Sequence, residues 1–339
     1  MDTASHVVMG VGIAGLSTLD PVIAENTATM QAVAIGAIIG SLAPDFDTVL
    51  KMKNNASYIT NHRGATHSIP AVLLLSIVIS TVIYLFLPAA SLFHLWLWTF
   101  LAVVIHVFVD IFNAYGTKAL APIKDKWIAI GSINIFDPFM FILHIAGILL
   151  WLAGTNPGYT FLSIYMILAL YYVWRMKVRN GVIRQARRLH PNASHIFVSP
   201  TYRWSEFHLV IRTQDHLHVA TWKKKTIRYL ESYLFEPIPN DPIIQAALED
   251  QNLSAFLSFS PTYRWEIEER PFGYDVIFTD LRYRSAGYYP FISVVRLNRD
   301  LMITGSYTGW IYDLEKLEYK LQTSKGSKKK KRARLLNAT

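Results

Sequence analysis

The stretch FHLWLWTFLAVVIHVFVDIFN, residues 93–113, decides the fold of this chain. It supplies the roughly 20 apolar residues that a helix needs to cross a bilayer, and its one formal charge is Asp110. The surrounding window 68–117 holds no other formal charge, and the window 135–174 holds only Asp137. Because a backbone in hydrocarbon must satisfy its own hydrogen bonds, we expect both windows to form membrane helices.

Each of the two windows is long enough for two spans. Pro88 divides the first window, and the segment 154–158 divides the second. We therefore expect a polytopic α-helical membrane bundle with four long spans, at about 69–87, 93–113, 136–153 and 159–176. Two shorter runs rich in glycine and alanine precede these spans, at 7–19 and 30–43. Small residues let helices approach closely, so these runs are expected to form a short N-terminal helical pair, as a hairpin or partly re-entrant.

The charge of the chain is divided unevenly between its halves. Of 339 residues, 52% are hydrophobic and 17% are charged, against about 25% charged residues in an average soluble domain. Residues 1–174 carry 6 Lys/Arg and 8 Asp/Glu, whereas residues 175–339 carry 27 Lys/Arg and 16 Asp/Glu. The absence of cysteine excludes disulfides, thiolate-bound zinc, iron–sulfur clusters and a cysteine nucleophile.

The distribution of Lys and Arg predicts how the bundle is oriented. Six of these residues follow the last expected span between 175 and 188, which marks that end as cytoplasmic. The loops 45–67 and 114–134 carry three each and face the same side, whereas the loops 88–92 and 154–158 carry none. We therefore expect a multi-pass protein of the bacterial inner membrane with both termini in the cytoplasm. The N-terminal segment has no positively charged region, so a cleaved signal peptide is not expected.

The second half predicts a soluble domain that is rich in β-strands, of the α+β class. Segments such as 207–211, 274–278 and 291–295 are rich in β-branched and aromatic residues. One helix is expected at about 241–251, with Asn240 as its N-cap. The expected organisation is a membrane-embedded domain at 1–176, a basic juxtamembrane linker at 177–191, a cytoplasmic β-rich domain at 192–322 and a disordered polybasic tail at 323–339.

Two further features of this half leave alternatives open. The hexapeptide SPTYRW occurs at 199–204 and at 260–265, which indicates either an internal duplication or two similar turns entering strands of one antiparallel sheet. The tail holds the basic run 325–334, which would be drawn to the anionic lipid of the cytoplasmic face. No nucleic acid is expected as a partner, because no stacking platform or recognition motif accompanies the run.

The residues that carry chemistry converge on one membrane depth. His106 and Asp110 are four apart and share a helix face, and an ionisable pair in an apolar span is a functional candidate. The orientation of the loops puts six further residues at the same cytoplasmic level: His6, Asp45, Asp47, His62, His67 and Asp137. His and carboxylate ligands together suit one or two divalent cations, Zn or Mn above all.

We assign roles on this basis. The predicted metal ligands are His6, Asp45, His62, His67, His106 and Asp110. Asp47 and Asp137 are predicted to be catalytic, and the planar fork of Arg63 is predicted to bind a substrate phosphate. An aspartate beside a proline is often a turn or cap residue, which is the alternative for Asp45 and Asp137. His94 and His144 are expected to be structural.

At these positions the chain resembles the YdjM family of membrane-bound, metal-dependent hydrolases, and most closely its YfhP-like members. The resemblance covers roughly residues 1–175 and rests on the His6 segment, APDFD at 43–47, HRGATHS at 62–68, HVFVD at 106–110 and the pair Asp137-Pro138. It implies hydrolase activity. The order of His and Asp is also loosely similar to zinc-dependent phospholipase C and related nucleases, but their downstream His-x-x-x-Glu is missing here, since Ile148 follows His144. That departure favours one or two metals over three.

The sequence therefore predicts an inner-membrane metal-dependent hydrolase with its site at the cytoplasmic face. A phosphoester or lipid-linked substrate is expected, because paired metal sites act on phosphoesters and because membrane lipid surrounds the site. The alternative is an ion or metal transporter that uses the same His/Asp cluster. A third interpretation makes the bundle a passive anchor for the basic domain, which leaves the carboxylate of Asp110 within a span unexplained.

Overall fold

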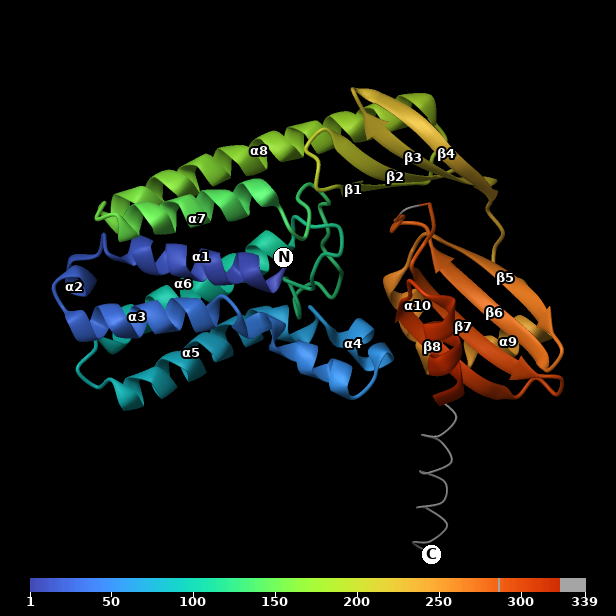
Figure 1. The fold of residues 1–339 in the computed structure, drawn as a ribbon, viewed down its shortest axis with the longest axis horizontal. Coiled ribbons are helices and arrows are strands. Elements are labelled where there is room, and N and C mark those ends of the chain that lie inside the picture. The colour runs from blue at the N-terminus through green and yellow to red at the C-terminus, as the bar shows by residue number, and fades with distance from the viewer. Residues whose placement is uncertain (286, 324–339) are drawn as a thin grey trace, which may run out of the picture.

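The structure is a computed structural model that describes residues 1–285 and 287–323. Figure 1 shows a helical bundle formed by the first half of the chain and two β-sheets formed by the second. The helical elements of the first half are α1 (Thr3–Ser17), α2 (Pro21–Ala24), α3 (Thr27–Gly40), η1 (Ala43–Met52), α4 (Asn55–Asn61), η2 (Ala65–His67), α5 (Ile69–Phe86), α6 (Leu92–Asp110), α7 (Pro138–Leu152) and α8 (Pro157–Leu189).

Three helices within the described residues, α5, α6 and α8, are long and apolar enough to cross a membrane. A fourth span results if α3 and η1, which meet at a 45° bend, are taken together. The prediction of an apolar membrane bundle is thus confirmed in its coarse form. Four long spans are not confirmed, because α7 has only 15 residues. Part of the reason is local: the side chain of Asp137 accepts a hydrogen bond from the backbone N–H of Phe139, so the helix begins at Pro138, two residues after the expected start at 136.

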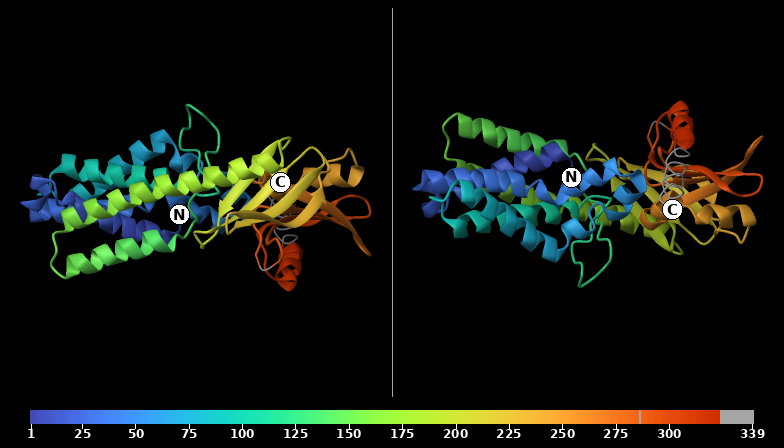
Figure 2. Two further views of the ribbon diagram at one scale, coloured as in Figure 1. Left: turned by 90° about the horizontal axis from the view of Figure 1, so that it is seen from above. Right: turned by 90° about the horizontal axis from the view of Figure 1, so that it is seen from below.

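Helix α8 is longer than the expected span. It runs without a break for 33 residues, through most of the segment expected to be a linker, and its far end packs on the first sheet. Both views of Figure 2 show the bundle and the sheets lying end to end, with α8 reaching from one to the other. The guanidinium of Arg175, within α8, donates to the carbonyls of Ser132 (3.0 Å) and Trp204 (2.8 Å). The helix thereby connects the two halves of the molecule.

The two N-terminal helices form the centre of the bundle. Helices α1 and α3 lie side by side, and α1 also packs against α7 and α8 (Figure 1). A Cβ atom added at Gly10 would lie 2.9 Å from Cα of Ile38 in α3. The two backbones therefore approach as closely as the small residues of the sequence predicted.

The second half contains two antiparallel sheets of four strands. The first sheet has the order β1 (His195–Pro200), β2 (Glu206–Arg212), β3 (His216–Lys223) and β4 (Thr226–Leu234). The second has the order β5 (Tyr263–Arg270), β6 (Gly273–Asp280), β7 (Phe291–Asn298) and β8 (Ile303–Trp310). Helices α9 (Pro242–Leu248) and α10 (Gln251–Phe259) contact the second sheet. A β-rich α/β half is thus confirmed.

Two details of this half differ from the sequence predictions. The single helix expected at 241–251 is two helices: Asp241, rather than Asn240, caps α9, and Asp250 caps α10 after α9 has ended. Each aspartate accepts hydrogen bonds from the first turn that follows it, which is why the apolar run is interrupted. The basic run of the tail lies outside the described residues.

The two copies of the hexapeptide occupy different structural positions. The first copy ends strand β1 and enters the turn toward β2, whereas the second copy leads into β5. The copies belong to different sheets, so they are not two strand entries of one sheet, and they are not equivalent positions of a duplicated unit.

Close packing of α1 on α3 is testable with a matched pair of glycine substitutions. Gly10→Ala forces backbone atoms apart, and overpacking of this kind costs about 1–3 kcal/mol. We expect the midpoint of thermal unfolding in detergent to fall by about 2–10 °C. Gly181→Ala in α8 is the control, because the nearest atom to its added Cβ is 4.0 Å away. An unchanged midpoint for Gly10→Ala would contradict the α1–α3 contact.

Candidate metal centre

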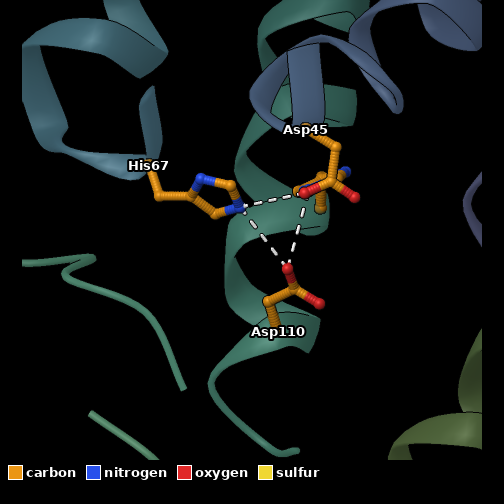
Figure 3. A group of neighbouring side chains, drawn as sticks. Asp45, His67 and Asp110 are labelled. Carbon is orange, nitrogen blue, oxygen red and sulfur yellow. Dashed lines mark ion pairs between the residues drawn. The ribbon is translucent and has the colours of Figure 1, made fainter. Parts of the chain in front are cut away.

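Four side chains from three elements point at one another at the end of the bundle. One ligand atom each of Asp45 (η1), His67 (η2), His106 and Asp110 (both α6) lies within 4.8 Å of all the others. Figure 3 shows Asp45, His67 and Asp110 facing a common centre. Nε2 of His67 is 3.4 Å from Oδ2 of Asp110 and 3.7 Å from Oδ1 of Asp45, and Nε2 of His106 is 3.7 Å from both oxygens. We refer to these four residues as the His/Asp cluster.

The sequence brings these residues together through the ends of its helices. His106 and Asp110 lie one turn apart on α6, and α6 ends at Asp110. Asp45 follows the bend between α3 and η1, and His67 lies directly before α5 begins. Each residue thus lies at or near the same end of a helix, as the orientation of the loops predicted.

The four atoms that face the centre lack hydrogen-bond partners among the described residues. They are Oδ1 of Asp45, Nε2 of His67, Nε2 of His106 and Oδ2 of Asp110, and all four atoms are buried. Buried polar atoms almost always have a partner, and leaving one unpaired costs about 1–3 kcal/mol. Two imidazole nitrogens and two carboxylate oxygens that converge on one point form a ligand set that fits a divalent cation.

Hydrogen bonds on the far side of each imidazole fix the nitrogen that faces the centre. Nδ1 of His106 lies 2.6 Å from the carbonyl oxygen of Ser41, which can only accept, so Nδ1 carries the proton and Nε2 presents its lone pair. Nδ1 of His67 lies 3.0 Å from Oγ1 of Thr66. That hydroxyl donates its single hydrogen to Asp47 (2.7 Å), so it accepts from His67, and Nε2 of His67 is likewise a lone pair.

Asp47 organises the loop that carries His67. Besides Thr66, its carboxylate accepts from the backbone N–H of Arg63 (3.0 Å) and pairs with Nδ1 of His62 (2.7 Å). Arg63 has a φ of 61°, a left-handed conformation that is uncommon for a residue other than glycine and is held here by this bond. Asp45, Asp47 and His62 form a second group whose ligand atoms lie within 4.8 Å of one another. Burial lowers the pKa of His67, which keeps its Nε2 unprotonated.

His6 and Arg63 lie beside the cluster. The imidazole of His6 stacks on that of His106, with ring centroids 3.7 Å apart, and its Nε2 is 3.7 Å from Oδ1 of Asp110. Nε of Arg63 lies 3.3 Å from Oδ2 of Asp110, and the α-amino group of Met1 contacts Oδ1. Arg63, predicted to bind substrate, therefore also balances the charge of a buried carboxylate.

Asp137 is not brought into either group. Its carboxylate caps α7 and accepts a hydrogen bond from the hydroxyl of Tyr171 (2.7 Å), which is the cap position that the sequence left open as the alternative. His94 pairs with Asp20 at 3.6 Å, and Nδ1 of His144 contacts the carbonyl of Met140. These two histidines occupy the structural positions expected of them.

Three groups near the cluster were missed by sequence reasoning. They are the carbonyl of Ser41, the hydroxyl of Thr66 and the α-amino group of Met1. For Thr66 a signal existed, because it lies inside the motif HRGATHS next to a predicted ligand. A backbone carbonyl carries no signal in the sequence.

Comparison with known proteins identifies the family of the first half of the chain. The YdjM inner membrane protein family matches residues 1–182, which is more than half of the chain. The chain belongs to the YdjM family. The resemblance predicted from the sequence is confirmed, and the family is one of inner membrane proteins, which agrees with the apolar helices of the bundle.

The remainder of the chain matches two domains described for YfhP. The YfhP middle domain matches residues 191–233, the first sheet, and the YfhP C-terminal alpha/beta plait domain matches residues 242–321, the second sheet and its helices. An uncharacterised protein YfhP of Bacillus subtilis strain 168 is 50% identical over 323 residues, 95% of this chain and 99% of that protein. No solved structure matches the chain at a significant level.

The His/Asp cluster predicts that the protein binds a metal ion and that substitution of a cluster residue removes it. Purified in detergent, the chain is expected to hold a stoichiometric divalent cation, measured by elemental analysis, and His106→Ala and Asp110→Asn are expected to lose it. His144→Ala is the matched control, because it removes another buried histidine of the same bundle that lies outside the cluster. Equal metal content in His106→Ala and His144→Ala would exclude the cluster as the site.

The hydrogen bond between Thr66 and His67 predicts a smaller loss of metal affinity than the loss of a ligand would cause. Thr66→Val keeps the shape of the side chain and removes the hydroxyl that fixes the His67 ring. Loss of such an outer partner typically reduces metal affinity about 10–100-fold. Thr60→Val, which removes a hydroxyl that bonds only the carbonyl of Ala56, is the control in the same competition titration with a chelating dye. Unchanged metal affinity in Thr66→Val would show that the hydrogen bonds linking Asp47, Thr66 and His67 do not contribute to metal binding.

Proposed function

We propose that the protein is a membrane-embedded, metal-dependent hydrolase that cleaves a phosphoester, with its active site at the cytoplasmic end of the bundle. The observation that carries this proposal is the His/Asp cluster, whose four inward atoms are buried and have no hydrogen-bond partner in the described part of the chain, while Lys51 and Arg63 line the adjacent cavity. The family of the chain supports its location in the membrane, and the reaction is inferred from the chemistry of the site.

The cluster supplies two imidazoles and two carboxylates, a set that suits Zn or Mn. We propose one cation, held by Asp45, His67, His106 and Asp110, since Asp47 and His62 of the second group are already bonded to each other. When bound, a divalent cation supplies Lewis acidity toward a phosphoryl oxygen and acidifies a water molecule. His6, stacked on His106, supports the ring of that ligand.

His62 is the residue placed to move a proton. Its Nδ1 pairs with Asp47, which orients the ring, and the residue lines a cavity next to Asp45 and Arg63. A histidine in this arrangement can accept a proton from water or give one to a leaving group, and such groups contribute typically about 10²–10⁴-fold to the rate. Arg63 lines the same cavity and is the chain's own anchor for a phosphate oxygen.

The charges around the bundle support the orientation in this proposal. The loops that carry the cluster are those with Lys and Arg, which favours a cytoplasmic position for the cluster, the N-terminal segment and the soluble half. Within this topology a phosphoester can reach the site either from the cytoplasm or as a lipid head group.

Transport is the alternative use of such a cluster. Transport sites tend to lie near the bilayer midplane with access from both faces. Here His106 and Asp110 occupy the last two turns of α6, beside the soluble half of the molecule (Figure 1). The position at one end of the bundle supports hydrolysis over transport.

The proposal is tested with p-nitrophenyl phosphate as a chromogenic phosphoester and the full chain in detergent with added Mn or Zn. We expect turnover that Asp110→Asn abolishes, and that His62→Gln lowers about 100-fold without loss of metal. His94→Gln, on the opposite end of α6, is the control and is expected to keep full activity.

Two results would overturn the proposal. One is a metal-loaded wild-type chain that hydrolyses neither a phosphomonoester nor a phosphodiester. The other is metal uptake into proteoliposomes that is lost in Asp110→Asn, because that outcome would assign the cluster to transport.

A further inference from the structure

A cavity of about 350 Å³ lies between the metal centre and the C-terminal unit formed by β5–β8, α9 and α10. Asp45, His62 and Arg63 line one side of it, and Phe259, Phe291 and Trp310 line the other. We call this cavity the seam pocket. Asp45 is the partly exposed member of the His/Asp cluster, so the seam pocket is where the cluster meets its surroundings.

Aromatic rings dominate the walls of the seam pocket. They come from both halves of the molecule: Tyr58, Tyr115, Trp127, Phe259, Phe291 and Trp310. Trp310 keeps 39% of its surface exposed although its ring contacts those of Phe291 and Tyr283, at centroid distances of 5.4 and 5.1 Å. Its indole is therefore held in place by neighbours while it still offers surface to a ligand.

The C-terminal unit is attached to the segments that build the metal centre. Nδ2 of Asn55, in α4, donates to the carbonyl of Thr308 (3.0 Å), and Ile59 packs against the core of the C-terminal unit. Tyr115, a few residues after Asp110, stacks on Tyr283 with ring centroids 5.0 Å apart and planes 12° apart. Figure 1 shows α4 facing α10 and β8. These contacts fix the aromatic wall relative to the cluster.

The opposite side of the seam pocket carries two basic side chains beside the carboxylates of Asp2 and Asp45. Arg63 borders the cluster, and Lys51 lines the pocket with its Nζ 4.3 Å above the ring of Tyr58. A ligand with a phosphate at the metal centre would therefore find positive charge around that phosphate and aromatic faces beyond it.

We propose that the seam pocket binds the alcohol part of a soluble phosphate monoester, and that this part carries a planar aromatic ring system, as in a nucleoside monophosphate. The inference rests on the proposed function, because the phosphate is placed at the metal centre. Aromatic faces bind planar rings by stacking, which is worth about 1–3 kcal/mol for each nucleobase. The C-terminal unit, with Trp310, is then the part of the chain that selects the substrate.

The walls favour a ring over a lipid chain. The pocket lies between the bundle and the C-terminal unit rather than between spans, and polar residues such as Asp2, Thr48 and Lys51 line it as well as the rings. A cavity of this size lies at the lower end of the range for small-molecule sites, about 300–1,000 Å³. A flat ring with a short polar link to phosphate fits this combination of shape and charge.

Two phosphonates that cannot be hydrolysed separate ring stacking from apolar burial. Phenylphosphonate and cyclohexylphosphonate carry the same phosphonate group and six ring carbons, but only the first ring is flat. In calorimetric titrations of the full metal-loaded chain in detergent, we expect phenylphosphonate to bind about tenfold more tightly, which corresponds to about 1.4 kcal/mol of stacking. Adenosine monophosphate should displace it, and short-chain phosphatidic acid should not.

Variants of Trp310 test whether the C-terminal unit causes the preference for phenylphosphonate over cyclohexylphosphonate. Trp310→Leu is expected to reduce the tenfold ratio to less than twofold while metal content and the unfolding midpoint stay unchanged, and Trp310→Tyr is expected to retain most of it. Trp204→Leu is the control, because Trp204 is an exposed tryptophan in the turn between β1 and β2 and does not line the pocket.

The outcomes separate this inference from the proposed function. Equal affinity for the two phosphonates, or an unchanged ratio in Trp310→Leu, would overturn the seam pocket as a ring site, even if the chain hydrolyses p-nitrophenyl phosphate. Displacement by phosphatidic acid would replace it with a lipid site. A chain that prefers phenylphosphonate but shows no hydrolysis would keep the seam pocket and refute the hydrolase.

Discussion

The carboxylate of Asp110 is the constraint on which the rest of the structure depends. It ends α6 with no exposed surface, and a charge in such a place is costly unless opposite charge surrounds it. Two cationic groups from different parts of the chain supply this charge: Arg63 from the loop before η2 and the α-amino group of Met1. The bend between α3 and η1 adds Asp45, which brings a second negative charge and thereby a place for a divalent cation.

Part of this site could be predicted from the sequence because spacing and membrane depth are properties of single helices. The four-residue spacing of His106 and Asp110 fixes a shared face, and the distribution of Lys and Arg fixes which helix ends lie together. The roles of Asp137 and Thr66 could not be predicted in the same way. Whether an aspartate beside a proline caps its own helix or turns toward a neighbour depends on partners such as Tyr171, which the sequence places 34 residues away.

The fold likewise combines features that local sequence patterns predict with features that depend on contacts between distant residues. The apolar spans and the β-rich half follow from composition and period, and they were predicted in outline. The lengths of α7 and α9 depend on single capping side chains, and those were misjudged. How the second sheet docks on the bundle rests on contacts such as Asn55 with Thr308 and Tyr115 with Tyr283, which join residues more than 160 positions apart. No local pattern encodes such contacts, although they shape the cavity beside the metal centre.

The proposed metal centre consists of two imidazoles and two carboxylates that coordinate one divalent cation at the end of the bundle. X-ray absorption at the zinc edge of the purified, zinc-loaded chain measures this coordination. We expect a first shell of nitrogen and oxygen at about 2.0–2.1 Å, with the outer-shell scattering of two imidazole rings. A shell of oxygen alone, with no imidazole scattering, would contradict it.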